Sequence, residues 1–585
     1  MVNKRNEYNL AAKRSGDLLS QRKEIIALSS EKALGRILEA KHPAALIHSF
    51  PEQDFYFLVH DIGLNDSYEL LALASDRQWD YILDVELWER DRIDTGSVTR
   101  WFDILFQASP DRFIKWAIEK KSDLIEYYLY NNIRVAIREH DQDPSTLGKD
   151  FVTIDDIFYI KVLDHPEYEA PEPEAETDEE KPGKAQREEF IIKMLEKIAE
   201  HDHKKYQQIL FESLSVLPAE MEEEFYRIRN VRLAEKGFLP FHEAAGIYSP
   251  LKPEALVRRK KISKRRDEYV SLMPVPLYPY GMLKEDNLFA MSLNRISAGE
   301  VLQNLQVEFA ALCNQIIAAD QKNIKSRDEL KEVVRKACGY LSIGLERLLK
   351  AGQKADTGRT AAMIEQYHVA HIFRTGFGLA LELKESAKKW VQSAWFAKFG
   401  LPLSFWGEEW MGVLGGLLIK KPLYFDNFKT GRIYREFAAL SEVEECERVL
   451  ESVMAFDDLM RLMTVEISQV QDRFLNHKKI ILTLFARYRL GLPEEVAPVP
   501  FDDFMRFFRS MWAKGRRPRK TDILIKESFL SWVSERAGIK SSEITRLLGQ
   551  TFEDLFAEIE NEYGRIAFKD LDPRYISLFL LQKKR

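Results

Sequence analysis

The chain has 585 residues, enough for about three or four packed domains of roughly 150 residues each, which excludes a fold built on one hydrophobic core. Hydrophobic residues make up 45% of it and charged residues 31%, a balance that excludes wholesale disorder. The 93 acidic and 86 basic residues give a net charge of −7, so the molecule as a whole does not attract nucleic acid or anionic lipid, and any such binding is local.

Cysteine usage and hydropathy indicate the compartment. Cys313, Cys338 and Cys446 lie far apart without a CxxC pair, which argues against a disulfide framework or a thiolate metal site and fits a reducing compartment. The basic N-terminus has no apolar run of the kind that a secretory signal needs. The most apolar window, Trp410 to Ile419, is far shorter than the roughly 20 residues of a spanning helix. We therefore expect a cytoplasmic protein without a membrane span.

Residues 30–163 form the first predicted folded domain. Most of it consists of short amphipathic segments that open with a polar residue, and Ser75, Ser109 and Ser122 are expected to cap three of them. Apolar residues recur at helical spacing and include many aromatic side chains, as in a layer of stacked helices. The pattern predicts α-solenoid-like helical repeats.

The aromatic content of this layer suggests a binding surface. It is higher than a thin helical layer needs for its own core, so we expect some aromatic side chains to reach the surface and bind protein. The alternative is that all of them pack internally or against residues 188–270. The segment Leu124 to Ile137 is expected as helix, and Phe151 to Leu163, rich in β-branched and aromatic residues around Asp155-Asp156, as a lone β-hairpin that ends the domain.

Changes in composition divide the chain further. Residues 164–187 carry nine acidic and three basic side chains and four prolines, which is typical of a disordered linker. Long helical segments follow, with a Pro-rich strip ending near Gly281 as a joint. The predicted organisation is mainly α and multi-domain, with a basic N-terminal arm (1–29), the helical-repeat domain (30–163), the acidic disordered linker (164–187), a helical segment with a basic run and the joint (188–281), the main helical domain (282–491) and a C-terminal helical segment (492–585).

One motif raises the possibility of a metal site. Glu365, His368 and His371 fall at positions i, i+3 and i+6 of an expected helix, and Glu-x-x-His is the unit that di-iron helical bundles use. A di-iron site needs a second such motif and two more glutamates, and Glu39 to His42, the other match, ends at Pro43. We therefore predict polar and interfacial histidines, and neither a cofactor nor a metal, with a metal-dependent enzyme as an alternative.

A basic run is the most concentrated charge signal in the chain. Seven of nine residues are cationic, which is enough to bind phosphate groups locally: Arg258, Arg259, Lys260, Lys261, Lys264, Arg265 and Arg266. The favoured interpretation is a solvated, self-repelling segment before the joint, which could dock on the acidic linker of the same chain. Nucleic-acid binding through this run is the second hypothesis.

Two resemblances accompany these patterns. The text HPAALIHSFPEQDFYFLVHDIGLNDSYELLALASDRQWDYILD (His42 to Asp84) resembles the short helical repeats in the cytosolic N-domain of MgtE-type magnesium transporters. The texts FLPFHEAAGIYSPLKPE (Phe238 to Glu254) and LIKKPLYFDNFKTGRIYREFAALSEVEE (Leu418 to Glu445) resemble an uncharacterised bacterial family over nearly the whole chain. The first resemblance implies a helical-repeat fold and no binding residue, and the second implies no activity.

These observations favour a non-enzymatic protein-interaction or regulatory scaffold. Repeated helices offer extended surfaces, and the motifs assemble no catalytic constellation, so no catalytic residue is assigned. The expected partner is a protein. Its identity and the oligomeric state do not follow from the sequence.

Overall fold

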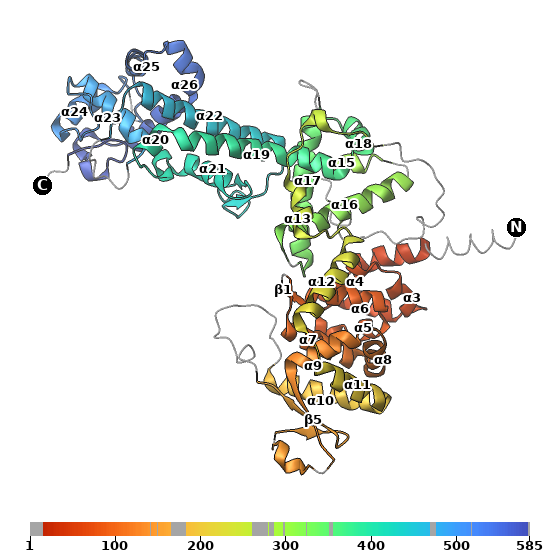
Figure 1. The fold of residues 1–585 in the computed structure, drawn as a ribbon. Coiled ribbons are helices and arrows are strands. Elements are labelled where there is room, and N and C mark those ends of the chain that lie inside the picture. Colours follow the sequence, from red (N-terminus) through yellow and green to blue (C-terminus); the bar gives the residue numbers. More distant parts are fainter. Residues whose placement is uncertain are drawn as a thin grey trace. The chain divides into compact units, whose positions relative to one another are not determined.

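A computed structural model gives the fold of the chain (Figure 1). Helices dominate it, and in the part that it describes the strands form three short antiparallel sheets, which confirms the mainly α class. The structure describes residues 16–89, 91–140, 142–148, 150–164, 183–259, 279, 283, 286–296, 299–322, 324–349, 355–467, 475–515 and 518–582.

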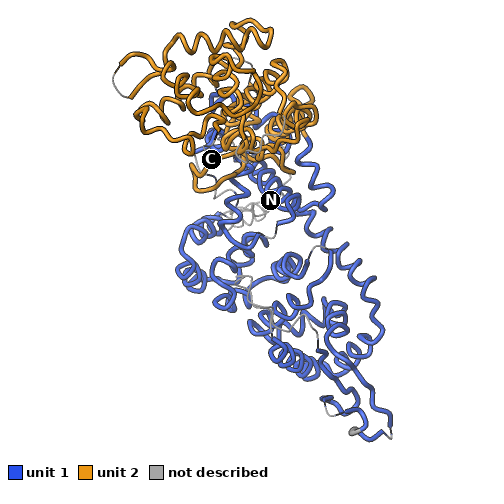
Figure 2. Tube along the Cα trace, turned by 90° about the vertical axis from the view of Figure 1, so that its left-hand side faces the viewer, with its two compact units in different colours: residues 1–249, 256–338, 354–373 blue, residues 250–255, 339–353, 374–585 orange. Residues whose placement is uncertain are grey.

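Two compact units make up the molecule, and each combines segments from different parts of the chain (Figure 2). Unit 1 contains residues 1–249, 256–338 and 354–373, and unit 2 contains residues 250–255, 339–353 and 374–585. The domains predicted from composition are contiguous stretches of the chain, unlike these two units, and their boundaries stay predictions.

Unit 1 begins with a layer of short helices. Residues 16–27, expected as part of an N-terminal arm, are already helical. In the layer that follows, each helix packs against the second one after it, as α2 does with α4, α3 with α5, α4 with α6 and α5 with α7. The bounds are α2 (Ser30–Leu38), α3 (Pro43–His48), α4 (Glu52–Ile62), α5 (Tyr68–Leu73), α6 (Asp76–Glu86), α7 (Thr95–Ala108), α8 (Pro110–Lys120) and α9 (Ser122–Asn132), with the two-residue strands β1 (Trp88–Glu89) and β2 (Arg92–Ile93) between α6 and α7.

Serine caps define only part of these helix starts. Ser75 forms a capping box with Gln78, in which each side chain bonds to the other residue's backbone N–H at the start of α6. Ser109 precedes Pro110 at α8 but makes no side-chain cap bond, and Ser122 lies inside α9. Ser109 thus occupies the expected N-cap position without a cap bond, and the expected cap at Ser122 is wrong.

Most aromatic side chains of this layer are buried, so little of the expected aromatic surface is present. Trp79, Trp101 and Phe113 are at most 1% exposed, whereas Tyr130 is 41% exposed. Later helices cover the layer, and Phe190 of α10 (Lys184–His201) contacts the rings of Phe106 and Tyr128. The ring of Phe225, in α12 (Pro218–Ala234), lies edge-on to Tyr127. Burial against these helices, which gains about 25 cal/mol per Å² of apolar surface, accounts for the aromatic content.

A three-stranded antiparallel sheet follows α9. The hairpin expected over 151–163 is present as β4 (Val152–Thr153) and β5 (Phe158–Val162), but it is not alone. The strand β3 (Ile133–Ile137) pairs with β5 from Ile133 opposite Val162 to Ile137 opposite Phe158, so the strand order is β3-β5-β4. The helix expected to reach Ile137 therefore ends at Asn132. The 3-10 turn η2 (Pro144–Leu147) lies between β3 and β4.

The rest of unit 1 returns to helices. Most of the predicted acidic linker, residues 165–182, lies outside the described residues. Its predicted C-terminal boundary at residue 187 is wrong, because residues 184–187 belong to α10. A long helix, α16 (Gly299–Asp320), packs against the segment before the Pro-rich joint, and Asn314 bonds to Gln53 of α4 and to the Lys236 carbonyl. The remaining elements are α11 (His203–Ser213), α13 (Phe241–Ala244), η4 (Ala245–Tyr248), α15 (Leu288–Leu293) and α18 (Thr357–Gln366); α17 (Arg327–Leu348) and α19 (Val369–Ser393) contribute to both units.

Unit 2 is a helical body with one short hairpin. Its helices α17 and α19 approach each other at Gly376, where a Cβ atom would lie 2.0 Å from the Tyr340 carbonyl oxygen. Among the described residues, no helix is long and apolar enough to cross a membrane. The elements are η5 (Pro253–Ala255), α20 (Trp395–Lys398), η7 (Leu403–Trp406), α21 (Glu408–Leu418), β6 (Tyr424–Phe425), β7 (Tyr434–Arg435), α22 (Leu440–Leu462), α23 (His477–Arg489), α24 (Phe501–Ser510), α25 (Ile523–Ala537), α26 (Ser541–Tyr563), η8 (Phe568–Asp570) and η9 (Pro573–Tyr575).

Candidate functional site

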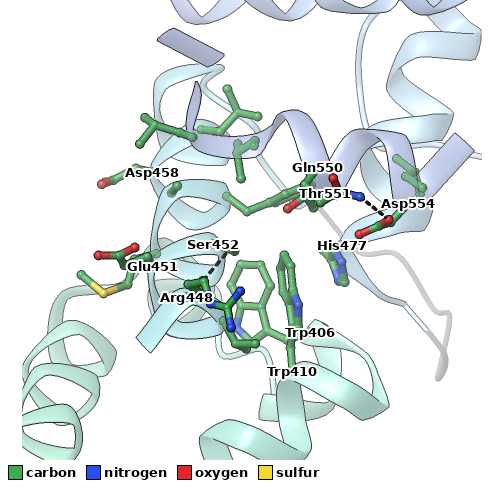
Figure 3. Close-up of a pocket in the computed structure, with 18 of the residues that line it drawn as sticks. Trp406, Trp410, Arg448, Glu451, Ser452, Asp458, His477, Gln550, Thr551 and Asp554 are labelled. Atoms are coloured by element: carbon green, nitrogen blue, oxygen red, sulfur yellow. Dashed lines mark hydrogen bonds between the residues drawn. The ribbon is translucent and has the colours of Figure 1, made fainter. Parts of the chain in front are cut away.

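A cleft of about 1080 Å³ opens between two long helices of unit 2 (Figure 3). Helix α22 forms one wall and helix α26 the other. The floor comes from Trp406 at the end of η7, from Trp410 in the first turn of α21 and from His477 at the start of α23. Asn476 caps α23 by accepting a hydrogen bond from the Lys479 backbone N–H at 2.9 Å, and this bond sets His477 in the first turn.

The floor of the cleft is a cluster of rings around His477. Trp410 stacks on the imidazole with ring centroids 4.7 Å apart and an interplanar angle of 10°, and Phe456 meets it edge-on at 5.1 Å. His477 Nδ1 lies 3.3 Å from the Phe405 carbonyl oxygen. Burial lowers the pKa of His477 to about 3, because the charged imidazolium would lose its hydration. The ring is therefore neutral at pH 7, and Nδ1–H is the donor to Phe405.

The two walls present apolar rows toward the cleft. On α22 the row contains Ala455, Leu459 and Leu462, and on α26 it contains Ile544 and Leu547, all spaced by three or four residues. This spacing places each row on one face of its helix. Leu462 is 38% exposed and Leu547 is 44% exposed, so apolar surface is open to solvent inside the cleft.

The rim of the cleft carries an excess of negative charge. Seven carboxylates and four basic side chains line the cleft. Asp458 pairs with Arg461, and Lys478 pairs with Glu558, which lies outside the lining. Six acidic residues and two basic residues then remain: Glu408, Glu409, Glu445, Glu451, Glu543 and Asp554 against Arg448 and Arg546.

The polar side chains on the walls bond mainly along their own helices. Ser452 Oγ donates to the Arg448 carbonyl at 2.9 Å, and Gln550 Nε2 donates to Asp554 at 2.8 Å (Figure 3). The cleft thus combines an aromatic floor, exposed leucines and charged rims, which are the components of a recognition surface.

The metal hypothesis assumed one helix through Glu365, His368 and His371, and that assumption is wrong. Helix α18 ends at Gln366, and α19 begins at Val369. Glu365 is exposed on α18, whereas His368 precedes α19, with ring centroids of His368 and His371 5.5 Å apart. Within the described ranges, no group of three or more His, Cys, Asp or Glu side chains could hold a metal ion.

The basic run is committed in part to the fold. Arg258 is exposed, but the Arg259 side chain is only 5% exposed and forms a bidentate pair with Glu308, at 2.9 Å and 3.1 Å. Arg259 also donates to the carbonyl oxygen of Tyr367, and its backbone N–H donates to that of Gln366 at 2.8 Å. Arg259 is therefore a structural cation, which corrects its place among the phosphate-binding candidates. The other five, Lys260, Lys261, Lys264, Arg265 and Arg266, lie outside the described residues.

Glu308 of α16 joins the two motifs that the sequence separates. Its carboxylate holds Arg259, accepts a hydrogen bond from the Val369 backbone N–H at 3.1 Å, and lies 3.6 Å from His368 Nδ1. A carboxylate at the start of α19 also interacts favourably with the helix dipole. The first residues of the basic run and the histidine motif thus belong to one junction of unit 1, in which the Arg259 side chain is buried and His368 is exposed.

Comparison with known proteins places the chain in a family. A family model matches residues 12–582, nearly the whole length. The chain belongs to the family of unknown function DUF6178. This confirms the expected membership of an uncharacterised family. No curated protein and no solved structure matches the chain, so the resemblance to the MgtE N-domain stays a prediction.

The residues of the cleft were not singled out from the sequence. In the sequence, Trp410 is notable only as the first residue of the apolar window Trp410 to Ile419, which is too short for a membrane span. The available signal was the helical spacing of Ala455, Leu459 and Leu462 in α22 and of Ile544 and Leu547 in α26. What the sequence did not supply is their pairing, because 85 positions separate Leu462 from Leu547, which lie on the two walls.

Proposed function

We propose that this protein is a non-enzymatic interaction scaffold that recognises other proteins through the cleft between α22 and α26. The observation that carries the proposal is the exposed apolar lining, with Leu462 at 38% and Leu547 at 44%. Apolar surface that stays in contact with water is unfavourable, and burying it in a complex contributes about 25 cal/mol per Å² to the free energy of binding. The aromatic floor adds rigid contact area of the kind found at interaction hot spots.

Unit 1 supports the same role as a framework. We assign helices α2–α9 to an α-solenoid-like repeat related to the MgtE N-domain, a proposal supported by the regular packing of each helix on the second one after it. In this proposal the repeat serves as a structural framework. It does not bind partners through its aromatic side chains, since most of these are buried. The protein works in the cytoplasm, which its free and buried cysteines Cys313, Cys338 and Cys446 support.

The two alternatives have weaker support. Nucleic-acid binding would rely on Arg258 and on the cations after Lys260, since Arg259 is paired with Glu308. A metal-dependent enzyme would need Glu365 to join His368 and His371, but a helix break separates them. Neither alternative uses the cleft, whose acidic rim repels phosphate groups.

A peptide-display selection against the purified full-length chain tests the proposal. Selected peptides are measured against the wild type and two variants with the same substitution, Leu547→Asp inside the cleft and Leu524→Asp outside it, where Leu524 is 67% exposed at the start of α25. We expect the Leu547→Asp variant to bind at least about tenfold more weakly, equivalent to 1.4 kcal/mol, because a charge would face the buried peptide.

The control variant decides whether the effect belongs to the cleft. Leu524→Asp should bind the selected peptides like the wild type. Equal losses in both variants, no loss in either, or a selection that enriches no peptide would each overturn the proposal.

A further inference from the structure

The cleft has the form of a seat for a helix. Its lining residues on α22 run from Glu445 to Leu462, a length of about 26 Å at 1.5 Å per residue. Leu459 and Ile544 are buried where α22 and α26 pack together, whereas Leu462 and Leu547 stay exposed, so a third helix can pack its side chains over this groove in the same way as helices pack in a protein interior. An apolar stripe with spacing i, i+3, i+4 and i+7 on the partner would match this groove.

The rim selects the charge of the partner. Once the pairs Asp458–Arg461 and Lys478–Glu558 are set aside, six carboxylates face two arginines. Glu451 on α22 and Glu543 on α26 are exposed on opposite walls. A helix bound between them would have both of its flanks next to negative charge, so lysine or arginine on these flanks is attracted and glutamate is repelled.

The floor favours a cationic or aromatic side chain at one point of that helix. Trp410 is half-buried, and its indole rests on the neutral ring of His477. An indole face attracts ammonium and guanidinium groups, and a neutral neighbour does not oppose this attraction as an imidazolium would.

From these observations we infer that the occupant of the cleft is a basic amphipathic helix of a partner protein. The inference rests on the proposed function, because it names the partner class for the same cleft. Phosphate-rich ligands do not match the acidic rim, and an acidic helix would place like charges opposite Glu451 and Glu543.

Three synthetic peptides of about 18 residues, or five helical turns, test the inference on the full chain. The first has leucines at helical spacing and lysines elsewhere, the second has glutamate in place of lysine, and the third has the composition of the first in scrambled order. Fluorescence anisotropy of the labelled peptides gives the affinities. We expect the first to bind at least tenfold more tightly than each of the others, because only the first has both the apolar stripe and the positive flanks.

Charge-reversed variants locate the binding. Glu451→Lys combined with Glu543→Lys should weaken the first peptide about tenfold or more, since both rims lose their attraction. Glu220→Lys combined with Glu223→Lys on α12 changes the net charge equally, at exposed residues of unit 1, and should change the affinity less than threefold. An equal loss in both double variants, or an acidic or scrambled peptide that binds as tightly as the first, would overturn the inference.

The peptide-display selection separates this inference from the proposed function. Enriched peptides that depend on Leu547 but are acidic, or that lack helical spacing of apolar residues, would overturn the basic-helix inference while leaving the interaction scaffold in place. If no enriched peptide depends on Leu547, both fail.

Discussion

The side chain of Arg259 has a structural role that its sequence context conceals. It stands next to Arg258 in a run of cations, and of these two described arginines Arg258 is exposed, whereas the Arg259 side chain is buried and paired with Glu308. Removing one partner of a buried ion pair leaves the other charge uncompensated, at a typical cost of about 3–5 kcal/mol. We predict that Arg259→Ala lowers the free energy of unfolding in urea by about 3 kcal/mol, because Glu308 is itself partly solvated.

The neighbouring residue provides the control. Arg258→Ala removes the same side chain at an exposed position and should change the stability by less than about 0.5 kcal/mol. Equal effects of the two substitutions would show that the pair with Glu308 contributes nothing specific.

His477 makes the stability of the molecule depend on pH. Its folded-state pKa of about 3 lies below the value of about 6.5 expected in the unfolded chain. Between these pH values the imidazole is protonated in the unfolded state and neutral in the folded state. No stability is lost above pH 6.5, and the loss grows as the pH falls from 6.5 toward 3. At pH 5 it amounts to about 2 kcal/mol, from 1.36 kcal/mol for each pH unit.

A replacement without a titrating group isolates this contribution. We predict that the free energy of unfolding of a His477→Phe variant, measured in urea at pH 7 and pH 5, falls by about 2 kcal/mol less than that of the wild type between these values. Parallel pH profiles for the two proteins would contradict the assignment of a neutral buried imidazole.

At the scale of elements, the sequence predicts those helices and hairpins that are stabilised by interactions between residues close together in the chain. The helices of the first layer, the Ser75 capping box and the β4–β5 hairpin depend on residues a few positions apart, and the structure contains all of them. Strand β3 depends on pairing with β5, more than 20 residues away, so local sequence alone predicts the end of a helix at Ile133, Val135 and Ile137. Tertiary context decided the state of this segment.

The break between α18 and α19 has the same kind of origin. Local sequence around His368 contains neither proline nor glycine, so a continuous helix was the natural expectation. Glu308, sixty-one residues upstream, accepts the Val369 N–H and helps to begin α19 there. The candidate cleft was unpredictable for a similar reason, because its walls, α22 and α26, come together only in the folded unit.

At the scale of the whole molecule, unit 1 joins distant segments through α16. Gln53 and Asn314 exchange hydrogen bonds of 2.8 Å and 3.2 Å, and Tyr248 donates to Asp320 at 2.6 Å. These bonds connect α16 to residues on the other side of the Pro-rich joint near Gly281, where composition alone suggested a boundary. A cut at 281 would therefore divide one packed unit rather than separate two.

Splitting the chain there gives the last prediction. The fragments 1–281 and 282–585 are produced alone and together, and amide hydrogen exchange is followed by mass spectrometry. In fragment 282–585 alone, α16 loses Gln53, Lys236 and Arg259, so we expect its amides to exchange at least about tenfold faster than in the full chain. Helix α22 is the internal control, because α20, α21, α25 and α26, against which it packs, are all present in the same fragment. Co-expression should restore the protection of α16 and yield a complex that co-purifies. Full protection of α16 in the isolated fragment would show instead that the joint is a true domain boundary.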